Sequence, residues 1–117
     1  MTDKIKKGSE GEQLAASYLE KKGYVILERN YRYKHAEIDL IVQMDDWLVF
    51  VEVKTRGSHQ FGFPEEFVDD QKAEKIGEGA EQYILEKEWI NNVRYDIISI
   101  TIKNGTPEIL HIEDAIQ

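Results

Sequence analysis

Apolar and polar positions alternate with a period of two in the middle of the chain. Residues Ala36–Met44 (AEIDLIVQM) and Trp47–Lys54 (WLVFVEVK) are rich in β-branched and aromatic side chains, which favour strands. Asp45 and Asp46 separate the two runs, and aspartate is a common turn residue. The pattern predicts an antiparallel hairpin.

The predicted turn determines which residues of the hairpin oppose each other. A loop centred on the turn places Asp39 opposite Glu52 and Glu37 opposite Lys54. Directly opposed residues have Cβ atoms about 4.5 to 5.5 Å apart. Strand alternation groups Asp39 and Ile41 with Phe50, Glu52 and Lys54 on one face, and the other face then carries Ile38, Leu40, Val42, Val49, Val51 and Val53.

Two carboxylates on opposed positions of an apolar hairpin repel each other, and their burial is costly unless they are paired or bind a cation. Mg²⁺ prefers oxygen ligands and is often held by one or two carboxylates with waters and a substrate phosphate. Asp39 and Glu52 are therefore candidate ligands, and Lys54 could hold a phosphate oxygen or orient water. The spacing alone equally allows a surface on which Lys54 pairs with Glu37 and Asp39.

A helix is predicted over residues 3–22, where one stripe is small and apolar apart from a single acid. The acid, Glu12, falls at the spacing of the packing face. Alternatively, Ser9 is the N-cap of this helix and Glu12 completes a capping box at position N3. The stripe consists of Gly8, Glu12, Ala15, Ala16 and Leu19.

The remaining pattern completes the order αβββαββ, with a central mixed β-sheet flanked by helices. At 117 residues the chain is long enough for one core, so we expect a single α/β domain over residues 1–117. The further elements are a strand Tyr24–Tyr33, a loop over 57–64, a helix from Asp69 or Asp70 to about Glu88, and strands Val93–Lys103 and Pro107–Ile112 around a type I′ turn at Asn104-Gly105.

Two details of these later elements can be predicted. Gly77 and Gly79 each weaken the second helix by about 1 kcal/mol relative to alanine. Their presence indicates close packing on the sheet or, alternatively, close approach to a ligand. Asp96 follows Arg94 and Tyr95, and we expect it to pair with the arginine rather than to bind a metal ion.

Composition narrows the possible chemistry. The chain has no cysteine, which excludes disulfides and thiolate zinc sites. It has no apolar run long enough for a membrane span and no signal-peptide pattern at its start, so a cytoplasmic location without membrane contact is the expectation. With 15 basic and 23 acidic residues its net charge is −8, unlike most nucleic-acid binders. Residues 1–34, however, carry eight basic and five acidic side chains.

Several motifs, taken in order, resemble the YraN-like family of small bacterial proteins, which belongs to the PD-(D/E)xK, or restriction-endonuclease-like, superfamily. The similarity covers roughly residues 8–100. The helix acid, the hairpin aspartate and the Glu-x-Lys are also similar to those of archaeal Holliday-junction resolvases. Ala36 departs from the family, which usually has glycine there. The motifs are Gly8-Ser9-Glu10-Gly11-Glu12, Gly23-Tyr24, Glu37-Ile38-Asp39-Leu40-Ile41, Phe50-Val51-Glu52-Val53-Lys54, Lys72 and Arg94-Tyr95-Asp96.

The resemblance implies a restriction-endonuclease-like fold and a role for each residue of the hairpin site. Asp39 and Glu52 would be metal ligands and Lys54 the catalytic lysine. Glu12 would support the metal, directly or through water. In the corresponding mechanism the backbone carbonyl of Val53 is a further ligand of Mg²⁺, for which Mn²⁺ could substitute.

The sequence therefore predicts a Mg²⁺-dependent nuclease that acts on DNA, as an endonuclease or as a processing factor for branched or single-stranded DNA. The candidate phosphate-binding residues are Arg56, Lys72, Lys34, Lys6 and Lys7. The alternative, from a different class, is a noncatalytic nucleic-acid or protein-binding module on the same fold. A protein partner and a homodimer both remain open.

Overall fold

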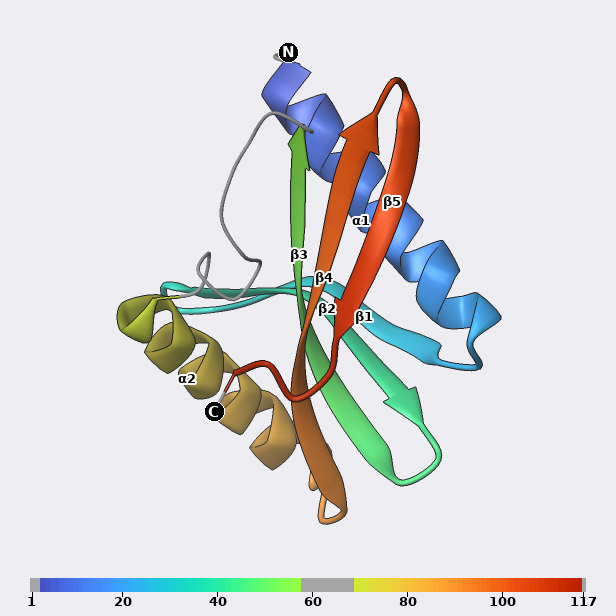
Figure 1. Cartoon of the computed structure of the whole chain (residues 1–117). Helices are drawn as coiled ribbons and strands as arrows, with labels where there is room; N and C mark the ends of the chain where they lie inside the picture. Colours follow the sequence, from blue (N-terminus) through green and yellow to red (C-terminus); the bar gives the residue numbers. More distant parts are fainter. Residues whose placement is uncertain (1–2, 58–68, 117) are drawn as a thin grey trace.

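A computed structural model of the chain describes residues 3–57 and 69–116, with side chains from residue 10 onward. In these residues two helices and five strands follow the predicted order αβββαββ (Figure 1). The predicted loop over 57–64 lies outside the described residues after Gly57. The elements are α1 (Asp3–Lys21), β1 (Val25–Tyr33), β2 (Ala36–Met44), β3 (Trp47–Gly57), α2 (Asp70–Lys87), β4 (Asn92–Lys103) and β5 (Thr106–Ile112).

The strands form one mixed sheet in the order β1-β2-β3-β4-β5. The β3–β4 pair is parallel and runs from Trp47 opposite Asn92 to Gly57 opposite Ile102, whereas the other pairs are antiparallel. A parallel pair needs a long crossover connection, and α2 lies within the one between β3 and β4. The predicted mixed sheet is confirmed.

Both predicted turns join antiparallel strands. The β2–β3 ladder pairs Leu40 with Val51 and continues to Met44 opposite Trp47, which is the predicted register around the aspartate turn. In the β4–β5 turn, Asn104 and Gly105 have φ angles of 51° and 77°. Positive φ at both central residues is the requirement of a type I′ turn.

The helices cover opposite faces of the sheet (Figure 1). Successive residues of β3 accordingly pack against different helices. Val49 and Val51 pack in the cluster beneath α1, whereas Leu48 and Phe50 pack in the cluster beneath α2. The α1 cluster further contains Ala15, Ala16, Leu19, Tyr24, Leu40, Val42, Ile98 and Ile100. The α2 cluster further contains Ile38, Ile41, Ile76, Ala80 and Tyr83.

The placement of Ile38 corrects one prediction. Strict alternation put Ile38 on the same face as Leu40, but Ile38 belongs to the α2 cluster and Leu40 to the α1 cluster. The pleat is interrupted between them, at Asp39. On the neighbouring strand Asn30 has a left-handed φ of 51°, and the described β1–β2 pairs pass over both Asn30 and Asp39.

The first residues of the two helices test the predicted start of α2 and the capping-box interpretation of Glu12. α2 is capped by Asp69, whose side chain accepts a hydrogen bond of 2.8 Å from the Lys72 amide, so the predicted start is confirmed. α1 begins at Asp3, so Ser9 lies inside the helix and the capping-box interpretation of Glu12 is wrong. Neither described helix combines the length and apolarity needed to cross a membrane.

The two α2 glycines differ in their surroundings. A Cβ added at Gly79 would lie 3.2 Å from the Cβ of Ala36 and 3.3 Å from Cδ1 of Ile38. A Cβ added at Gly77 would meet nothing within 4 Å. The prediction of close packing is therefore confirmed for Gly79 and wrong for Gly77.

These contacts predict different effects for the same substitution. Gly77→Ala should raise the free energy of unfolding by about 0.5–1 kcal/mol, because alanine is the better helix former and the space is open. Gly79→Ala should gain less or lose stability, because the new methyl group presses on β2. Urea denaturation of both variants makes the comparison, and equal gains would contradict the packing assigned to Gly79.

Candidate active site

The site is centred on Asp39, at the point where β2 and β3 separate. The described β2–β3 ladder ends at Leu40 opposite Val51, so the predicted direct pairing of Asp39 with Glu52 is not part of it. Instead, Oδ2 of Asp39 accepts a hydrogen bond of 2.8 Å from the backbone amide of Val53. The aspartate side chain thus takes the place of a backbone acceptor and holds the carboxylate against β3.

Glu52 is the buried carboxylate of the site, with only 6% of its side chain exposed. Its Oε1 lies 2.5 Å from Nζ of Lys72 and 3.5 Å from Nζ of Lys54. Glu37 instead pairs with Arg32 on β1, at 3.3 Å. The surface arrangement in which Lys54 pairs with Glu37 and Asp39 is therefore not the one observed, because Lys54 lies against Glu52.

Glu12 reaches the site from α1. The residue is partly buried, accepts a hydrogen bond from the Asn30 side chain and interacts electrostatically with Glu37 and Glu52. Its neighbour Gly11 is buried, and a Cβ there would lie 2.0 Å from Oγ1 of Thr55 on β3. The missing side chain lets α1 approach β3 closely, which brings Glu12 toward the carboxylates.

Burial and mutual repulsion disturb the titration of the site. Burial, followed by the charge of Glu52, raises the pKa of Asp39 to about 7, although the Val53 amide opposes the shift. Burial also raises the pKa of Glu12. Burial and the contact with Lys72 lower the pKa of Lys54. Carboxyls with raised pKa values beside a lysine with a lowered one are typical of functional sites.

Lys72 keeps its charge more firmly than Lys54 does. Burial acts to lower the pKa of Lys72, but the hydrogen bond to Glu52, together with the other contacts of the amine, outweighs burial and raises it. The sequence predicts phosphate binding by Lys72 but does not predict its contact with Glu52. The signal was present, because Lys72 stands four residues before Ile76 and so lies on the stripe of α2 that packs on the sheet.

The oxygen atoms at the gap between β2 and β3, where the two strands separate, suit a hard divalent cation. Asp39 and Glu52 offer carboxylate oxygens, and the Lys72 ammonium already occupies a cation position at Glu52. The carbonyl of Val53 points to the same strand edge as its amide, and the amide bonds to Asp39. Across the described residues, no group of three or more His, Cys, Asp or Glu side chains is close enough to hold a metal ion. The candidate ligands are the carboxylates of Asp39 and Glu52, the Val53 carbonyl and waters, with the Glu12 carboxylate close by.

The other predicted DNA-binding residues are distributed over several elements. Lys34 is exposed in the β1–β2 turn, with Nζ 5.2 Å from the ring centre of Tyr33. Arg56 is partly buried near the end of β3. The side chains of Lys6 and Lys7 lie outside the described residues. Lys72, by contrast, contacts Glu52 directly.

Asp96 belongs to a separate buried ion-pair network. It accepts two hydrogen bonds from Arg94, at 2.8 and 2.9 Å, and lies 2.7 Å from Nε2 of His111. Burial acts to raise the pKa of Asp96, but the hydrogen bonds from His111 and Arg94 outweigh it and lower the pKa. The predicted pairing with arginine is confirmed, and the network joins β4 to β5.

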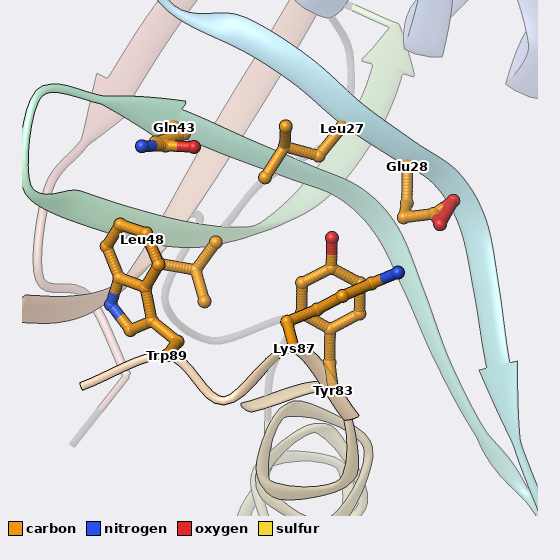
Figure 2. Close-up of a pocket in the computed structure, with 7 residues that line it drawn as sticks. All are labelled: Leu27, Glu28, Gln43, Leu48, Tyr83, Lys87 and Trp89. Carbon is orange, nitrogen blue, oxygen red and sulfur yellow. The ribbon is translucent and has the colours of Figure 1, made fainter. Parts of the chain in front are cut away.

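A pocket of about 370 Å³ opens near the other end of α2. Figure 2 shows Tyr83 and Trp89 facing Leu27 and Leu48, with Lys87 beside Tyr83. None of the predicted site residues lines this pocket. The pocket is therefore separate from the acids and lysines gathered where β2 and β3 part.

The fold and the site define a small mixed α/β protein with acids and lysines gathered where two strands part. The chain belongs to the Uncharacterised protein family UPF0102, whose family model matches residues 11–100. This range includes Glu12, Asp39, Glu52, Lys54 and Lys72, and the match confirms the predicted family.

Relatives of similar length support this membership. A UPF0102 protein of Cytophaga hutchinsonii is 46% identical over 97 residues, covering 83% of this chain and 86% of that protein. One from Syntrophomonas wolfei is 44% identical over 106 residues, covering 90% and 92%. One from Rhodococcus opacus is 42% identical over 118 residues, covering 98% and 99%.

The contact of Gly11 with β3 can be tested by a double-mutant cycle. Gly11→Ala should lower the free energy of unfolding by roughly 1–3 kcal/mol, because the methyl group collides with Thr55. Thr55→Ala removes Oγ1, so the double variant should be more stable than the sum of the single effects. Strict additivity in chemical denaturation would show that the two residues are not in contact.

The raised pKa of Asp39 predicts a pH effect on the metal-free protein. The folded protein keeps this proton up to about pH 7, whereas an unfolded chain loses it near 3.8. The folded state binds more protons over this range, so this group lowers stability as pH rises. Asp39→Asn cannot titrate, so it lacks this pH effect. The oxygen of its side-chain amide can still accept the hydrogen bond from the Val53 backbone amide.

In EDTA, the free energy of unfolding of Asp39→Asn should therefore rise relative to that of the parent protein between pH 5 and pH 8, by up to about 2.7 kcal/mol for a pKa of about 7. Glu78→Gln, at an exposed position of α2, is the matched control and should show no such divergence. If Asp39→Asn is clearly less stable than the parent at pH 8, Asp39 stabilises the fold as an ion-pair partner.

Proposed function

We propose that this protein is a Mg²⁺-dependent nuclease of the PD-(D/E)xK superfamily, with a restriction-endonuclease-like fold, that hydrolyses phosphodiester bonds in DNA. One observation carries the proposal: Asp39, Glu52 and Lys54 converge where β2 and β3 part. Glu12 approaches the same gap from α1. Acids and a lysine in this arrangement match the requirements of metal-assisted hydrolysis.

In this mechanism the carboxylates of Asp39 and Glu52 and the carbonyl of Val53 would hold the ion. Mg²⁺, when bound, would polarise a phosphoryl oxygen and offset its developing charge. The Lys54 amine would orient or activate the attacking water, and burial next to Lys72 favours its neutral form. Glu12 would accept a hydrogen bond from a water at the site or support a second ion.

The proposed substrate is DNA bound weakly or with assistance, including branched or single-stranded forms. A net charge of −8 opposes tight binding to phosphates. The same charge favours the second candidate function, a noncatalytic nucleic-acid or protein-binding module on this fold. The module does not explain why Lys54 and the acids Asp39 and Glu52 are kept together at one gap.

Cleavage assays separate the two functions. With Mg²⁺ or Mn²⁺, the purified protein should cut at least one of duplex, single-stranded, flap or four-way-junction DNA, and EDTA should abolish cleavage. Asp39→Asn, Glu52→Gln and Lys54→Ala should each lower the single-turnover rate by at least roughly a hundredfold, the scale of losing a positioned catalytic group.

Lys75→Ala and Glu78→Gln, both at exposed positions of α2, serve as matched controls and should leave the rate unchanged. Unaltered rates in all three site variants would refute the assignment of the site. DNA binding by the parent protein without cleavage of any substrate would favour the noncatalytic module.

A further inference from the structure

Lys72 and Glu52 form the closest charged contact at the candidate site. Nζ of Lys72 lies 2.5 Å from Oε1 of Glu52, compared with 3.5 Å for Nζ of Lys54. Both ammonium groups thus approach the same carboxylate oxygen. The side chain of Lys72 is 35% exposed and that of Glu52 only 6%, so the lysine compensates a charge that would otherwise be buried alone.

The backbone of Lys72 is fixed independently of this contact. Its amide donates to the side chain of the N-cap residue Asp69, and Ile76, one turn later, is buried on the sheet. The helix start is therefore anchored without the lysine side chain. A lysine side chain with several rotatable bonds can leave Glu52 while α2 stays in place.

A divalent cation at Glu52 would need the carboxylate oxygens that now face the ammonium group. Three cationic groups at one oxygen would repel one another strongly in a partly buried site. Asp39 also feels the charge of Lys72, so the same ammonium group partly neutralises both candidate ligands. The cation and the Lys72 ammonium thus compete for one position.

We propose that Lys72 is an internal counter-ion that occupies the metal position at Glu52 and is exchanged for a divalent cation when one binds. The exchange rests on the proposed metal site and adds a regulatory role for a residue outside the Glu-x-Lys motif. On release, the ammonium group faces solvent beside the site, where a DNA phosphate could bind it. The Lys72 ammonium group would then be available to a DNA phosphate only after the metal ion has bound.

Mn²⁺ binding measured by isothermal titration calorimetry without DNA tests the exchange. Lys72→Met keeps an unbranched side chain but removes the competing charge, so Mn²⁺ should bind at least roughly fivefold more tightly than in the parent protein. The metal-free variant should melt at a lower temperature, because Glu52 loses a partner. Lys75→Met removes the same charge from an exposed position of α2 and should change the affinity less than twofold.

Equal or weaker Mn²⁺ binding by Lys72→Met would overturn the exchange while leaving the proposed metal site intact. Absence of Mn²⁺ binding in both the parent and Lys72→Met would overturn the metal site itself. A lysine that only stabilises the fold would lower the melting temperature without changing the affinity.

A second measurement uses the parent protein and needs no variant to fold. Reductive methylation followed by mass spectrometry reports how readily each lysine amine reacts. Mg²⁺ should increase the modification rate of Lys72 severalfold, because the amine leaves Glu52, and should leave Lys75 unchanged. An unchanged or decreased rate at Lys72, under conditions where calorimetry shows the ion bound, would contradict the exchange.

Discussion

The hydrogen bond between the Val53 amide and the Asp39 carboxylate is the interaction on which the site depends. It stands where a backbone ladder would otherwise continue, and beyond it β3 pairs in the described ladders only with β4. If the β2–β3 ladder continued past this position, backbone groups of β2 would occupy the hydrogen-bonding edge of β3. The separation instead leaves a gap in the sheet that side chains from both faces can approach.

The helices complete this gap from opposite sides. Gly11 allows α1 to lie against Thr55, and Glu12 follows directly in the helix. From the other face, α2 contributes Lys72 at its capped start. Both Glu12 and Lys72 affect the titration of Asp39, although α1 and α2 cover different faces of the sheet. Carboxylates and ammonium groups therefore balance each other at one opening, an arrangement suited to an exchangeable cation.

Much of this architecture could be predicted from local patterns, and the failures have physical causes. The aspartate turn and the alternating apolar runs correctly predict the β2–β3 register from Leu40 to Met44. They could not reveal the interruption at Asp39, because it also involves β1, where the β1–β2 pairs pass over Asp39 and over Asn30 with its left-handed backbone. The contact of Lys72 with Glu52 could not be predicted for a related reason. The helical position of Lys72 can be read from the sequence, but the contact depends on how α2 lies across the sheet.

We propose that the gap between β2 and β3 binds a divalent cation through Asp39 and Glu52. A crystal structure of the protein with Mn²⁺, in which anomalous scattering locates the ion, tests it most directly. We expect one ion bound by oxygens of both carboxylates, with the Lys72 amine no longer in contact with Glu52. A gap without Mn²⁺ at saturating concentration, with the Lys72 to Glu52 contact intact, would contradict it.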